Sequence, residues 1–320
     1  MISRQEFAIS IVLFFCILVI IFSKFSTENV RGDRRQSAPQ AVSAAAEGAF
    51  TTPRAIVVDR ERDGSFYVVD SRNHRIQKFG PAGNFILSWG TQGDGPAQFK
   101  EPCGIDLGPD GSVYVSDTWN SRVQVFTPTG RFIMEFGREM SMWGPRDLVV
   151  TKQGNVFVAD TGNGKIEKFS KDGIHLMTIG GKGDGVLEFN EPFGMVQGPD
   201  NNIYVADRIN FRIQVITEEG KYVREFKVDG WERGQIVNGC LMEPYISISS
   251  GGKYIYITDS SKGQVLRYNL NGANKKVFEK NERGEDLFGC PIGISAGKDG
   301  KIYVTDSGLQ KLVTFMDEDK

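Results

Sequence analysis

Three residue types that can form ion pairs and catalytic sites recur together along the chain. An aspartate is followed by an asparagine three positions later and an arginine five positions later, most clearly in the stretch 117–126, DTWNSRVQVF. We name this combination the hook. Six copies follow one another at intervals of about 43 to 52 residues, a spacing typical of repeat proteins. The copies could form a ring of catalytic aspartates or a repeated structural brace.

The chemistry of the hook favours the structural interpretation. Aspartate and asparagine side chains bond to nearby backbone groups and fix tight turns, while an arginine can reach a carboxylate on its own repeat or the next one. The predicted brace residues are Asp70, Asn73, Arg75, Asp117, Asn120, Arg122, Asp160, Asn163, Lys165, Asp207, Asn210, Arg212, Asp259 and Asp306. In the last two copies Lys262 and Leu309 replace the asparagine, and Gln264 and Lys311 replace the arginine.

The residues around each hook predict four strands per repeat. A proline opens each repeat and precedes an apolar run, and a glycine-bearing turn then leads to a run that ends at the hook aspartate, as in VYVSD at 113–117. A third run follows the hook, and after a short turn comes a fourth, such as FIMEFG at 132–137. Runs rich in β-branched and aromatic residues indicate strands, and six four-stranded repeats are typical of a propeller.

The segment GIDLGPDGSVYVSDTWNSRVQVF, residues 104–126, resembles an NHL repeat, and the stretch from about residue 50 onward is similar to a six-bladed NHL propeller. The expected fold class is therefore all-β, a six-bladed β-propeller of NHL type, preceded by one transmembrane helix. The sixth repeat lacks a fourth strand. We expect either a weak closing strand from about Gln36 to Ala46 or a three-stranded last blade.

The transmembrane expectation rests on seventeen uncharged residues between Glu6 and Lys24, FAISIVLFFCILVIIFS. This run is just long enough to cross the hydrocarbon core as a helix. A cleavable signal peptide is the alternative, but no small-x-small cleavage site directly follows the run. The expected organisation is a signal anchor at 1–25, a flexible linker at 26–48 and the propeller at 49–320.

The orientation in the membrane has arguments on both sides. The flank after the apolar run carries Lys24, Arg31, Arg34 and Arg35, which by the positive-inside rule would keep the propeller in the cytoplasm. A single span close to the N-terminus, followed by a large folded domain, is instead the usual arrangement of an exported, anchored protein. We expect a single-pass membrane protein with an extracytoplasmic propeller.

Charge and cysteine content limit the function classes. The net charge is −2 at pH 7, which argues against a general nucleic-acid surface. Four cysteines in 320 residues are too few for a disulfide framework. Outside the apolar run they are Cys103, Cys240 and Cys290, so at least one thiol is free, and a Cys240–Cys290 bridge stays open.

The hook turns and the connections between blades emerge on one face of the predicted propeller, which we name the loop face. Aromatic and arginine side chains on loops of a rigid scaffold are typical of a binding surface. The predicted binding residues, on this face and at the mouth of the central channel, are Arg54, Arg72, Trp119, Arg146, Phe193, Arg208, Phe211 and Tyr245.

These features predict a membrane-anchored binding or scaffold protein whose partner is a protein, a peptide or an envelope polymer. A metal-dependent propeller lyase or lactonase is the alternative, although its site needs several histidine or carboxylate ligands. The only histidines, His74 and His175, fall at opposite ends of their blades. We therefore predict no catalytic residue, metal ligand or cofactor. An RNA-binding domain is the second alternative, with nucleic acid a disfavoured partner.

Overall fold

The computed structural model describes residues 48–231, 240 and 242–317. The predicted signal anchor and nearly all of the predicted linker lie outside these residues. Within the part of the chain that is described, no helix has the length and apolar character needed to span a membrane.

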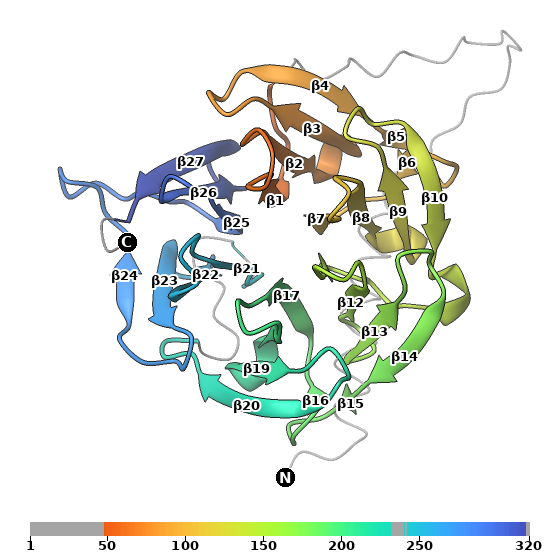
Figure 1. Ribbon diagram of the computed structural model, residues 1–320. Coiled ribbons are helices and arrows are strands. Elements are labelled where there is room, and N and C mark those ends of the chain that lie inside the picture. Colours follow the sequence, from red (N-terminus) through yellow and green to blue (C-terminus); the bar gives the residue numbers. More distant parts are fainter. Residues whose placement is uncertain (1–47, 232–239, 241, 318–320) are drawn as a thin grey trace, which may run out of the picture. The chain divides into compact units, whose positions relative to one another are not determined.

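Six antiparallel sheets surround a central channel (Figure 1), so the chain is an all-β, six-bladed propeller. Blade 1 contains β1 (Pro53–Val58), β2 (Phe66–Asp70), β3 (Arg75–Phe79) and β4 (Phe85–Trp89), and blade 2 contains β7 (Ile105–Leu107), β8 (Val113–Asp117), β9 (Arg122–Phe126) and β10 (Phe132–Phe136). Blade 3 contains β11 (Leu148–Val150), β12 (Val156–Asp160), β13 (Lys165–Phe169) and β14 (His175–Ile179).

Blade 4 contains β17 (Pro192–Gln197), β18 (Ile203–Asp207), β19 (Arg212–Ile216) and β20 (Tyr222–Lys227). Blade 5 contains β21 (Ile246–Ile248), β22 (Tyr254–Asp259), β23 (Gln264–Asn269) and β24 (Lys276–Phe278), and blade 6 contains β25 (Pro291–Ala296), β26 (Lys301–Asp306) and β27 (Lys311–Met316). Two short parallel pairs lie in the connections, β5 (Thr91–Gln92) with β6 (Gln98–Phe99) and β15 (Gly181–Lys182) with β16 (Glu188–Phe189).

Burial follows the order of strands within each blade. The second strand is buried on both faces, as in β8 and β12, because neighbouring blades cover it. The fourth strand alternates between exposed and partly buried residues, as in β4 and β14, because it lies at the periphery of the ring. The core therefore consists of apolar layers between adjacent blades.

The ring closes between blade 6 and blade 1 without a shared sheet among the described residues. Blade 6 has three strands, one of the two expected outcomes, and the proposed closing strand at 36–46 lies outside the described residues. The Val58 backbone N–H donates to Ser295 Oγ at 3.2 Å, and the Thr52 N–H donates to Gln310 Oε1 at 2.6 Å. Side-chain and backbone contacts thus join the two blades.

The hook is a short turn, with 3-10 geometry in blades 1, 2 and 4, and it ends in one residue with left-handed backbone. In blade 2 the turn spans Thr118–Asn120 and ends at Ser121, whose φ is 53°. The equivalent residues, four positions after each hook aspartate, all have φ between 52° and 66°: His74, Ser121, Gly164, Phe211, Gly263 and Gln310. Glycine adopts this conformation without strain, which accounts for its presence in blades 3 and 5.

Candidate functional site

The hook aspartates are buried hydrogen-bond acceptors. In blade 2, Asp117 has no exposed surface, and its Oδ2 accepts bonds from Asn120 Nδ2 at 2.9 Å and Arg122 Nε at 2.7 Å. Its Oδ1 accepts the Lys100 backbone N–H at 2.8 Å. One carboxylate therefore fixes both its own turn and the connection that enters the blade.

The same arrangement recurs around the ring. The connection donates a backbone N–H to the hook carboxylate at 2.7 Å in three other blades, from Thr51 to Asp70, from Trp143 to Asp160 and from Asn190 to Asp207. All six aspartates are fully buried. Their oxygens are engaged in the scaffold, so the hook offers no open carboxylate to a substrate.

Two arginines share one carboxylate at the mouth of the channel. Arg54 of blade 1 forms an ion pair and a hydrogen bond with Glu243, and Arg146 of blade 3 lies 4.0 Å from the same carboxylate. Arg146 also donates to the sulfur of the buried Cys103 at 3.5 Å. Burial alone would lower the pKa of Arg54, but its neighbours Cys103 and Glu243 outweigh burial and raise it. The mouth thus presents two stable guanidinium groups against one carboxylate.

Aromatic rings surround Arg146. Its guanidinium lies 5.5 Å from the Trp119 ring centre and 5.9 Å from that of Phe193, distances typical of cation–π contacts. Trp119 is 43% exposed and Trp143 is 63% exposed. A Cβ on Gly162 would lie 2.7 Å from the Trp143 ring, so glycine there leaves room for the indole. We name Trp119, Trp143 and Arg146 the tryptophan patch.

Tyr245 divides the channel below this mouth. Its hydroxyl donates toward the backbone oxygens of Cys103 and Arg146, each at 3.3 Å, and so reaches from blade 5 to blades 2 and 3. The Phe193 ring packs edge-on against it with the centres 5.6 Å apart. Tyr245 and Phe193 therefore form a partition across the channel.

Two of the predicted binding residues, Phe193 and Tyr245, are not exposed. Both side chains are buried, because their rings pack against each other and Tyr245 reaches across the channel to the backbone of Cys103 and Arg146. Their place in the sequence, directly after the opening prolines, does bring both of them into contact with Arg146.

The other predicted binding residues lie elsewhere on the loop face. Arg72, an exposed side chain, lies 3.7 Å from Glu101, and Arg208 forms an ion pair with Glu191. Phe211 is partly buried and packs against the core between blades 4 and 5. These three side chains do not join the cluster at the channel mouth.

Glu243 is the mouth residue that the sequence analysis missed. It directly precedes an opening proline, as Glu101 and Glu191 do, and each of the three glutamates pairs with an arginine. The repeated Glu-Pro dipeptide was the signal that could have identified it.

The two histidines have separate structural surroundings. His74 Nδ1 accepts the Glu101 backbone N–H at 3.2 Å, and His175 Nε2 lies 2.8 Å from the Glu167 carboxylate. Among the residues that the structure describes, no group of three or more histidine, cysteine or acidic side chains is arranged to hold a metal ion.

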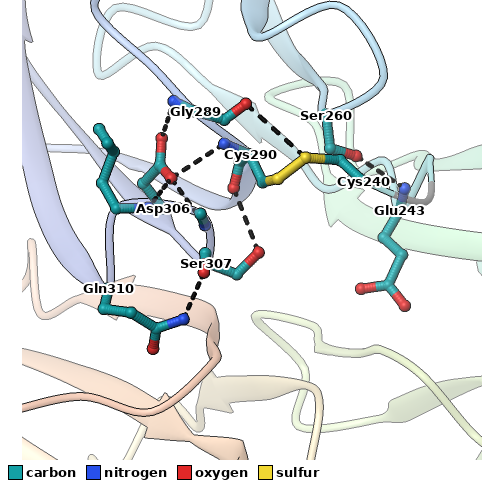
Figure 2. The surroundings of a disulfide bond; sticks show 10 residues. Cys240, Glu243, Ser260, Gly289, Cys290, Asp306, Ser307 and Gln310 are labelled. Carbon is teal, nitrogen blue, oxygen red and sulfur yellow. Dashed lines mark hydrogen bonds between the residues drawn. A yellow bond between two sulfur atoms is a disulfide. The ribbon is translucent and has the colours of Figure 1, made fainter. Parts of the chain in front are cut away.

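A disulfide between Cys240 and Cys290 joins the connections that enter blades 5 and 6 (Figure 2). The Cα atoms are 5.8 Å apart. The Cys290 N–H donates to Asp306 Oδ1 at 2.9 Å, and the Gly289 N–H donates to its Oδ2 at 2.7 Å. The bridge therefore ends directly beside the sixth hook.

Comparison with known proteins identifies the repeats. Residues 50–79, 99–126 and 142–169 match the NHL repeat. The protein brain tumor of Drosophila melanogaster is 27% identical over 133 residues, which are 41% of this chain but only 12% of that protein. The chain thus spans a small part of this relative.

Solved propeller structures resemble the whole fold. A streptogramin B lyase has a TM-score of 0.57 at 17% identity, with 80% of this chain and 77% of that chain covered. A gluconolactonase from Xanthomonas campestris has a TM-score of 0.63 at 12% identity, with 84% and 86% covered. At these identities the likeness shows the fold alone.

Proposed function

We propose that the protein is a membrane-anchored binding or scaffold protein that recognises a protein, a peptide or an envelope polymer through the loop face. The observation that supports this function best is the tryptophan patch. Two exposed indoles and an arginine stand on the hook turn of blade 2 and on the connection between blades 2 and 3. Tryptophan and arginine are the residue types most enriched among binding hot spots.

Rigidity of the patch supports the proposal further. The Trp143 backbone N–H donates to the buried Asp160 at 2.7 Å, and its carbonyl accepts the Gly162 N–H at 2.9 Å. Thr118, beside Trp119, donates through its hydroxyl to the Pro145 carbonyl at 2.9 Å. A surface held in place before binding loses little conformational entropy when a partner docks.

The same proposal includes attachment to a membrane and a propeller on its extracytoplasmic side. The apolar run at 7–23 would anchor the chain, and the linker would hold the propeller away from the bilayer. The Cys240–Cys290 disulfide supports an extracytoplasmic propeller, because such bonds persist in oxidising compartments and are rare in the cytosol.

Partner capture with the full-length chain tests the loop face. We expect Trp119→Ala combined with Trp143→Ala to lose the partners that the wild-type chain retains after cross-linking in cells. The control is Ile174→Ala, which removes a side chain that is 64% exposed in the turn between β13 and β14, on the opposite face. An unchanged partner set in the double variant would contradict the proposal.

Metal analysis of the purified full-length chain separates this proposal from the lyase or lactonase alternative, which shares the propeller fold. A binding protein is expected to carry no stoichiometric ion. One tightly bound divalent ion per chain would favour the enzyme.

A further inference from the structure

The channel holds a cavity on the side of Tyr245 that faces away from the loop face. It has a volume of about 750 Å³ and opens among the turns that follow the inner strands, including Asp59–Arg62 and Thr151–Lys152. Tyr245 and Asp147 lie at its inner end, while Arg54 and Arg146 at the loop-face mouth take no part in its lining. We name this cavity the chamber. Its volume is within the range of small-molecule sites.

The chamber wall is mainly apolar. Most of the side chains that the inner strands supply are aliphatic, among them Val57, Ile105, Leu107, Val149, Val196 and Ile294. Polar groups also line the chamber: Thr151, Gln197, Ser247 and Ser295 are neutral, Arg60, Arg62 and Lys152 are basic, and Asp59, Glu61, Asp106 and Asp147 are acidic. The aliphatic part of the wall can hold the apolar body of an organic molecule, and the polar groups can orient it.

Arg60 brings a positive charge into this chamber. It comes from the turn after β1 and reaches across to blade 5, where its Nη2 donates to Ser247 Oγ at 3.1 Å. Within the described part of the chain this is the one hydrogen bond that the Arg60 side chain makes, and the side chain forms no ion pair. By contrast, the partly buried Arg75 and the buried Arg122 and Arg212 each pair with a carboxylate.

The nearby carboxylates do not replace the missing partner. Asp106 Oδ1 accepts the Leu107 N–H and its Oδ2 accepts the Val150 N–H, both at 2.8 Å. Asp147 Oδ2 accepts the Met195 N–H at 2.9 Å. Asp59 lies 3.4 Å from Arg62 instead.

Burial also weakens these carboxylates as counter-ions. It raises the pKa of Asp106 to about 6 and the pKa of Asp147 well above its ordinary value. The same burial lowers the pKa of Arg60, although Asp106, Glu61 and Tyr256 oppose that shift. A partly buried guanidinium without an ion-pair partner is costly, and an anionic ligand would remove that cost.

We propose that the chamber binds a small organic carboxylate whose charged group pairs with Arg60 and whose apolar body packs against the aliphatic wall. The proposal is independent of the loop-face function, because Tyr245 and Phe193 separate the two ends of the channel. Ser247 is placed to donate a hydrogen bond to the same carboxylate.

The test uses 4-fluorobenzoate as probe and the full-length protein, with binding followed by ¹⁹F NMR line broadening. The neutral 4-fluorobenzyl alcohol is the matched probe without charge. We expect saturable broadening of the benzoate, and a weaker effect on the alcohol by about tenfold or more, as for a charge-assisted hydrogen bond. Absence of saturable benzoate binding up to about 10 mM would overturn the proposal.

Variants locate the site. Arg60→Gln is expected to weaken benzoate binding about tenfold or more. The control is Arg131→Gln, which changes an exposed arginine in the turn between β9 and β10 and is expected to leave binding unchanged. Val196→Phe fills the chamber and keeps the charge, so it is expected to block binding as well. Circular dichroism and thermal melting confirm that each variant is folded. Wild-type affinity in both Arg60→Gln and Val196→Phe would show that the chamber is not the site.

Discussion

Blade 2 and blade 6 fix the same turn with different chemistry. In blade 2 the hook carboxylate binds a fully buried arginine, which also pairs with Glu135 and donates to two backbone oxygens of the connection, those of Gly95 and Gln98. In blade 6, Asp306 accepts backbone N–H groups, including those of Gly289, Cys290 and Leu309, and the connection is tied by the disulfide (Figure 2).

The hydrogen-bond acceptors near the inner strands also differ between these parts of the ring. Asp106 and Asp147 of blades 2 and 3 each accept a backbone N–H from the next blade. Ser247 and Ser295 do the same for blades 5 and 6, each at 3.2 Å, through neutral hydroxyls. At these inner-strand positions the acceptor is a carboxylate in blades 2 and 3 and a neutral hydroxyl in blades 5 and 6, where a buried ion pair between Arg267 and Asp317 and the disulfide add further links.

This difference indicates that the propeller geometry constrains the position of each acceptor more than its charge. A carboxylate and a hydroxyl can both accept the N–H of the next inner strand. The chemical choice instead decides which condition destabilises each part of the ring. Buried charges respond to pH and to loss of their partner, whereas the disulfide responds to reductant.

Loss of the blade 2 arginine is expected to have the largest effect. Arg122→Met keeps a similar length but leaves Asp117 buried without its cation, and breaking such a pair costs about 3–5 kcal/mol. Gln264→Met is the matched change in blade 5, where one hydrogen bond from a neutral amide to the Asp259 carboxylate is lost, at about 1.5–3 kcal/mol. Urea unfolding of the two variants measures both; equal losses would remove the distinction between the blades.

Loss of the disulfide comes next. Replacing Cys240 and Cys290 by serine opens a loop with a sequence separation of 50 residues, and the free energy of unfolding is expected to fall by about 2–4 kcal/mol. Adding dithiothreitol should lower the stability of the wild-type chain by the same amount and leave the double variant unchanged. A wild-type chain that is insensitive to reductant would show that the hook alone holds blade 6.

The sequence predicts most of the scaffold because its signals are local and repeated. The run VYVSD and its five counterparts gave the second strands, and the hook aspartates marked where each of those strands ends. The sequence did not predict the left-handed backbone of the residue that ends each hook. Only two of the six copies have a glycine there, Gly164 and Gly263, and the other residue types give no sign of this conformation. Blade number and strand order therefore follow from periodicity, whereas local backbone conformation follows only where glycine occurs.

The candidate sites were predicted less well because they depend on side chains from distant blades. Arg54 belongs to β1, Arg146 precedes β11 and Glu243 precedes β21. Both arginines nevertheless meet at the Glu243 carboxylate. Tyr245 is buried because it reaches across the channel, which no local pattern indicates. Arg60 enters the chamber from a turn, where no periodicity predicts its direction.

The smallest predicted effect is a change in pH dependence at Asp106. Burial raises its pKa to about 6 from an ordinary value of 3.8, so the folded chain binds more protons than the unfolded chain between these values. The Asp106 contribution to stability therefore falls as pH rises from about 4 to 6 and stays low at higher pH.

Asp106→Asn removes this ionisation and keeps an oxygen that can accept the Val150 N–H. The variant is expected to match the wild-type chain near pH 4 and to exceed its free energy of unfolding by about 1–2 kcal/mol near pH 8. The size is modest because Asp106 lies at the open chamber and is only partly shielded from water. Ser247→Ala, the matched change in blade 5, is expected to lower stability equally at both pH values, because a hydroxyl does not titrate in this range. Urea unfolding at the two pH values checks both variants. A pH-independent difference in stability between Asp106→Asn and the wild-type chain would contradict the prediction. It would mean that the Asp106 carboxylate ionises without cost and behaves like the neutral acceptors of blades 5 and 6.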